Sequence, residues 1–77
     1  MTPAKVNEVL DKYELLCDIL ELDAIPHIQS MIPKIRVFLD EGRIEKAMRW
    51  LGFIQGILWT HDVYSLEALK SHNRSDQ

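Results

Sequence analysis

The 77-residue sequence contains a single cysteine, Cys17, so it cannot form an intramolecular disulfide. Its three histidines, His27, His61 and His72, are too few and too far apart to suit a four-ligand structural zinc site. A chain of this size buries only about 60 % of its surface on folding, so these absences matter for its stability. Regular helix packing and self-association remain as the means of stabilising the fold.

Long apolar runs are also missing, because no stretch approaches the roughly 20 residues that a helix needs to cross a bilayer. Residues 1–5 lack the basic and then apolar layout of a secretory signal. Together with the lone thiol, these features predict a cytoplasmic protein that does not bind membranes. Lys and Arg number 9 against 12 Asp and Glu, and this net charge of −3 disfavours a general nucleic-acid binder.

The charges are unevenly distributed along the chain. Residues 1–24 carry six acids against two lysines, whereas residues 34–49 carry five cations against three acids. One interpretation is that neighbouring helices present complementary, solvated faces, since surface charges contribute little to stability. The other is that the basic segment docks an acidic partner.

Apolar residues recur at three- and four-residue steps, which predicts a helical protein. Thr2 is suited to cap the first helix and Pro3 to its first turn, and this helix runs to a break at residues 22–26. Asp23 is a candidate cap for the second helix. That helix either begins at the break and contains Pro33, or begins only at Ser30 with Pro33 in its first turn.

Gly42 supplies a left-handed residue to close the second helix, and a third helix follows over residues 43–59. Ser65 is the predicted cap of a short fourth helix, while residues 1–2 and about 73–77 are expected to fray. We therefore predict one all-α domain over residues 1–77. Its architecture should be a three-helix bundle with a short fourth C-terminal helix and antiparallel neighbours.

No group of residues predicts catalysis. Cys17 falls in the apolar stripe of the first helix and is expected to be a small buried hydrophobe. His61 and Asp62 adjoin the end of the third helix, where an imidazolium suits the helix dipole better than it suggests a triad. Gly52 and Gly56 lie within a helix and do not form a phosphate-binding loop. We expect a non-enzymatic protein with no cofactor and no metal ion.

The predicted third helix carries a second apolar stripe beside its core stripe. Tryptophan and arginine are enriched at binding hot spots, and this stripe is flanked by cations. The candidate partner-binding or oligomer interface consists of Arg43, Lys46, Arg49, Trp50, Phe53 and Ile57. The alternative is that the fourth helix covers this stripe and that Trp50 belongs to the core.

Further residues are candidates for helix packing. Gln55 lies near the core stripe, so its amide is either buried with partners that set helix register or reaches solvent at the edge. Gly52 and Gly56 either let two copies of this helix cross closely or only make room for Trp59 or the fourth helix. The back of the first helix offers a second candidate interface, Leu15, Ile19 and Leu22. One copy cannot hide all these apolar surfaces, so a homo-oligomer is predicted.

The run DEGRIEKAMRWLGFIQGILW over residues 40–59, followed by YSLE at 64–67 and SHNR at 71–74, resembles small accessory proteins of tailed bacteriophages. The likeness covers a little over half of the chain, and RWLGFIQGILW is its specific part. That family has no assigned activity, so no site residue is carried over. The resemblance implies a protein that binds and redirects host machinery or defence proteins.

The expected function is therefore a non-enzymatic interaction protein that binds and modulates a host bacterial protein in the host cytoplasm. The alternative is a nucleic-acid or nucleotide binder that uses the basic and aromatic face of the third helix.

Overall fold

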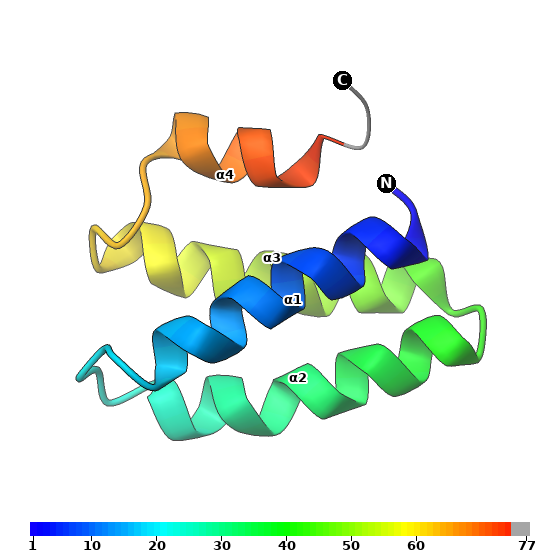
Figure 1. The fold of residues 1–77 in the computed structure, drawn as a ribbon, viewed down its shortest axis with the longest axis horizontal. Helices are drawn as coiled ribbons and strands as arrows, with labels where there is room; N and C mark the ends of the chain where they lie inside the picture. The colour runs from blue at the N-terminus through cyan, green and yellow to red at the C-terminus, as the bar shows by residue number, and fades with distance from the viewer. Residues whose placement is uncertain (75–77) are drawn as a thin grey trace.

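The structure, a computed structural model, describes residues 1–74 and contains four helices and no strand within that range. The helices are α1 (Pro3–Cys17), α2 (Ile25–Asp40), α3 (Ile44–Thr60) and α4 (Leu66–Asn73). Consecutive helices run antiparallel, with α2 packed against both α1 and α3 (Figure 1). The short α4 contacts α1 and α3 at the side of the molecule away from α2 (Figure 1). The predicted all-α bundle with a short C-terminal helix is confirmed.

Two helices begin with the predicted side-chain caps. The Oγ1 atom of Thr2 and the Oγ atom of Ser65 each accept the backbone N–H three residues later, both at 3.1 Å. Each bond satisfies one of the N–H groups that a helix start leaves without a partner. The prediction that Asp23 caps α2 is wrong, because Ala24 occupies that position and α2 has no side-chain cap.

α2 begins at Ile25 and continues through Pro33, so the alternative start at Ser30 is wrong. Pro26 lies in the first turn, where its missing N–H would have had no intrahelical acceptor. Pro33 lies on the exposed side of the helix, opposite the buried residues that face the core.

Left-handed residues close α2 and α3 in the same manner. Gly42 has a φ of +76° after α2, as predicted, and Asp62 has a φ of +59° after α3. In both cases the next residue donates its N–H to the carbonyl five residues earlier, at 2.8 Å. These are Schellman closures, which satisfy carbonyls at the helix end.

α1 ends at Cys17, earlier than the sequence pattern predicts. Backbone N–H groups of Ile19 and Leu20 both donate to the Leu16 carbonyl at 2.9 Å, so the helical turn persists briefly beyond that end. Leu22 then packs against the core and is partly buried. It therefore does not continue an exposed ridge with Leu15 and Ile19, contrary to the expectation of one three-residue surface.

The core lies between α1, α2 and α3, with Leu69 of α4 closing one side. Cys17 is buried within it and has no disulfide partner, and burial raises the pKa of its thiol. The apolar core side chains are Val6, Val9, Leu10, Tyr13, Ile25, Ile28, Met31, Ile32, Ile35, Leu39, Ala47, Leu51, Ile54 and Leu58. None of the helices in residues 1–74 is long and apolar enough to cross a membrane.

Both ends of the described chain make contacts with the rest of the fold. Met1 packs partly against the core, and Thr2 caps α1. Asn73 is the last residue of α4 and holds the side chain of Gln55. The predicted fraying of residues 75–77 lies outside the described residues.

Candidate functional site

A groove of about 490 Å³ runs between α2 and α3. The α2 residues on its wall follow the i, i+3, i+4 and i+7 spacing of one helix face, and the α3 residues share one face in the same way. The residues that define this α2–α3 groove are His27, Ser30, Met31, Lys34, Arg49, Trp50 and Phe53. Two of the predicted interface aromatics therefore line one concave surface.

The aromatic side chains of the groove differ in exposure. Trp50 is half-buried, and its ring meets Phe38 edge-on, with ring centroids 5.0 Å apart and planes at 83°. The ring that packs on Trp50 therefore comes from α2. The alternative that the fourth helix covers Trp50 is wrong. Phe53 is 55 % exposed, and its only aromatic neighbour in the described residues is His27, with ring centroids 5.9 Å apart and planes at 73°. More than half of the surface of Phe53 is therefore accessible to a ligand.

The cations of the predicted interface divide into two groups. Arg43 and Lys46 lie over the Phe38 ring, at 5.4 and 4.8 Å from its centroid, and do not line the groove. Arg49 does line the groove, opposite Lys34 of α2. Neither Lys34 nor Arg49 forms an ion pair with an acid in residues 1–74. The α2–α3 groove is therefore apolar inside and cationic at its rim.

Gly52 and Gly56 lie on an open face of α3. A Cβ atom built on either glycine would meet no atom within 4 Å, outside its own chain neighbours and helix backbone. The alternative that these glycines make room for Trp59 or α4 is therefore wrong. A shallow hollow beside them extends the apolar surface of the groove, and it is lined by Phe53, Gly56, half-buried Ile57, Trp59, Thr60 and His61.

Gln55 is only 7 % exposed and joins three helices. Its Nε2 donates to the Tyr13 hydroxyl at 3.1 Å and to Asn73 Oδ1 at 2.7 Å, while Asn73 Nδ2 donates back to Gln55 Oε1 at 3.0 Å. The Tyr13 hydroxyl lies 2.8 Å from His72 Nδ1. The lowered pKa of His72 favours a neutral imidazole, so we assign the hydroxyl hydrogen of Tyr13 to the bond with His72 Nδ1.

The side chains of this buried polar network are uncharged. Burial raises the pKa of Tyr13 to about 12, so its phenol stays protonated. Desolvation, followed by the charges of Lys12 and Lys5, lowers the pKa of His72 below its usual 6.5. The Tyr64 ring packs edge-on against His72 with centroids 4.5 Å apart. The network therefore fastens α4 to α1 and α3 through neutral groups.

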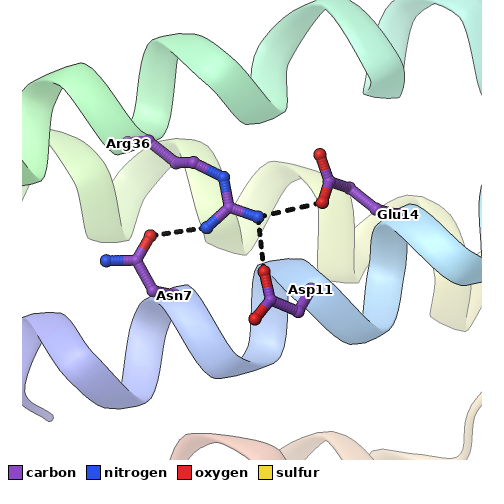
Figure 2. Close-up of polar contacts among 4 residues, drawn as sticks. All are labelled: Asn7, Asp11, Glu14 and Arg36. Carbon is purple, nitrogen blue, oxygen red and sulfur yellow. Dashed lines mark hydrogen bonds and ion pairs between the residues drawn. The ribbon is translucent and has the colours of Figure 1, made fainter.

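A second polar cluster joins α1 to α2 and agrees with the interpretation that neighbouring helices present complementary charges, although the residues involved were not predicted. Figure 2 shows Arg36 of α2 reaching across to three side chains of α1. Its Nη1 donates to Asn7 Oδ1 at 2.6 Å, and its Nη2 donates to Asp11 Oδ1 at 2.7 Å and to Glu14 Oε1 at 3.0 Å. Some of the acids of the first segment thus form ion pairs with a cation of the second segment within one copy of the chain. The only signal in the sequence is the opposite charge of the two segments.

The second candidate interface is reduced to two aliphatic side chains on the back of α1. Leu15 is 67 % exposed and Ile19 is 73 % exposed, the highest values among the large hydrophobic residues in the described range. Exposed Asp18 and Glu21 are close to them in the sequence and form no ion pair within residues 1–74. We call Leu15, Ile19, Asp18 and Glu21 the acidic ridge.

Within the described residues, no three His, Cys, Asp or Glu side chains gather as a metal ion would require. The α2–α3 groove and the acidic ridge are candidate binding surfaces. Comparisons of the chain with protein-family models, with curated proteins and with solved structures gave no match.

Proposed function

We propose that this chain is a non-enzymatic interaction protein that binds another protein through the α2–α3 groove. The observation that carries the proposal is Phe53, which is 55 % exposed inside an apolar groove that is also lined by two cations without ion pairs in residues 1–74. Concave apolar surfaces that contain an aromatic side chain and an arginine are typical of binding hot spots.

The shape of the groove favours a helical partner. Two antiparallel helices supply its walls, and such grooves suit an amphipathic helix that inserts apolar side chains at i, i+3 and i+4. Lys34 and Arg49 at the rim would steer an acidic partner toward the groove. The resemblance to small phage accessory proteins supports a host bacterial protein as the partner, modulated by binding in the host cytoplasm.

A second function draws on the same residues. Lys34, Arg49 and the exposed surface of Phe53 also suit a single-stranded nucleic acid, whose bases stack on exposed aromatic rings. The net charge of −3 and the packing of Trp50 against Phe38 make this use less favourable than protein binding.

Capture of partners from bacterial lysate by the tagged protein tests the proposal, with and without nuclease treatment. Phe53→Ala should abolish capture, whereas Val37→Ala should leave it intact, because Val37 is equally apolar and 50 % exposed but lies outside the groove. Both side chains are exposed, so both variants should fold. Capture that survives Phe53→Ala would contradict the proposal, and capture that disappears with nuclease would favour the nucleic-acid function.

A further inference from the structure

We infer that the α2–α3 groove also accepts the acidic ridge of a second copy of this chain, so that copies associate head to tail. The inference rests on the proposed function in one respect, that the groove is a binding surface. It goes further by naming an occupant with the required chemistry.

The acidic ridge has the shape of a groove ligand. Leu15 and Ile19 are four residues apart, and the backbone bonds to the Leu16 carbonyl keep both on one helical turn. They project two adjacent aliphatic side chains, which are 67 % and 73 % exposed in a single copy. Moving them into an apolar groove would remove that surface from water, which is favourable by about 25 cal/mol per Å².

Charge complementarity selects the groove as the place for this ridge. Asp18 and Glu21 on the ridge have no cationic partner within residues 1–74, and Lys34 and Arg49 at the groove have no acidic partner there. Contact between the two surfaces would pair each set of charges. A contact between two ridges would instead place acids against acids, and a contact between two grooves would place cations against cations. Both arrangements are unfavourable because like charges repel.

The geometry of such a contact has a consequence for assembly. A pair joined by a single contact of this kind leaves one groove and one ridge unoccupied, so further copies can add and form rings or open chains. The contact involves few side chains and should be weak and reversible compared with standard protein interfaces. The average mass in solution should therefore increase with protein concentration above the 9.0 kDa of one copy.

Two charge-reversal variants separate the two surfaces. The groove variant is Lys34→Glu with Arg49→Glu, and the ridge variant is Asp18→Lys with Glu21→Lys. All four side chains are exposed, and Asp18 follows the end of α1, where a cation suits the helix dipole, so both variants should fold. Circular dichroism and urea unfolding verify this for each variant.

Light scattering after size exclusion then measures the mass of each species. The wild type should associate, and each variant alone should remain a 9.0 kDa monomer up to high micromolar concentration. An equal mixture should associate again as the wild type does, because the unchanged ridge of the groove variant meets the unchanged groove of the ridge variant, and the two reversed surfaces also carry opposite charges. A mixture that stays monomeric, or a variant that associates alone as the wild type does, would overturn the inference.

The outcomes also separate this inference from the proposed function. A monomeric wild type whose capture of partners still depends on Phe53 would refute head-to-tail association and leave the proposed function intact. If the two variants associate when mixed but the tagged protein captures no partner from lysate, the result would support the inference and refute the binding of a different protein.

Discussion

Replacing Gly52 and Gly56 by alanine should stabilise the fold, although glycines inside helices often mark tight packing. Both lie in the middle of α3 on its exposed face, and neither has a positive φ. No atom outside their own helix segment lies within 4 Å of the Cβ that alanine would add. Each substitution therefore reduces the freedom of the unfolded chain without creating a clash.

The size of the gain follows from helix propensity. Alanine is more favourable than glycine by about 0.8–1.0 kcal/mol at an interior helix position, so the pair should add about 2 kcal/mol to the free energy of unfolding. For a domain of this length, about 1 kcal/mol corresponds to 4–8 °C in Tm, so the double variant should melt roughly 8–16 °C higher. Urea unfolding monitored by circular dichroism, together with a thermal scan, measures both quantities.

Gly42 provides a matched control, since alanine there also meets no atom within 4 Å. Its φ of +76° is left-handed, however, and an L side chain in that region costs roughly 1–2 kcal/mol. Gly42→Ala should therefore destabilise the protein, whereas the two substitutions in α3 stabilise it. Loss of stability in the Gly52→Ala, Gly56→Ala variant would refute this account of the open α3 face.

The remaining predictions concern the buried network and the helix ends. Gln55→Ala should lower the free energy of unfolding by about 3 kcal/mol, because three hydrogen bonds of about 1 kcal/mol each are lost, and hydrogen exchange should increase across α4. The lowered pKa of His72 means that the folded state binds fewer protons than the unfolded state below pH 6.5. The contribution of neutral His72 to the free energy of unfolding should thus be fully present above that pH and decrease as the pH falls. His72→Phe should therefore reduce the difference in the free energy of unfolding between urea melts at pH 7.5 and 5.5. Asp62→Gly should raise the free energy of unfolding by about 1 kcal/mol in the same assay, because glycine adopts the φ of +59° without strain. A decrease for Asp62→Gly, or unchanged pH dependence for His72→Phe, would contradict these assignments.

The sequence predicts a helix end well where residues close to that end determine it. Thr2, Ser65 and Gly42 act through hydrogen bonds or dihedral angles within a few residues, so their roles are visible without the fold. The end of α1 at Cys17 has no comparable signal, because neither glycine nor asparagine follows it. The contact of Leu22 with the core accompanies this early end, and that contact depends on tertiary structure.

The candidate site is predictable only in part, for a similar reason. The apolar and cationic stripe of α3 follows from helical periodicity, but its partner on α2 does not. Lys34 lines the groove and Phe38 covers Trp50 because of how α2 and α3 are rotated against each other. The contact between Tyr13 and His72 joins residues 59 positions apart, beyond any local pattern.

Site-specific photocrosslinking from position 53 tests the central claim that the α2–α3 groove binds a protein. A photoreactive phenylalanine at Phe53 should give a discrete crosslinked product in cells that contain the natural partners, and mass spectrometry would identify it as another protein or a second copy. The same group at Val37, outside the groove, should give none, and Lys34→Glu with Arg49→Glu should suppress the product from position 53. No product from position 53, or equal products from both positions, would contradict a binding role for the groove.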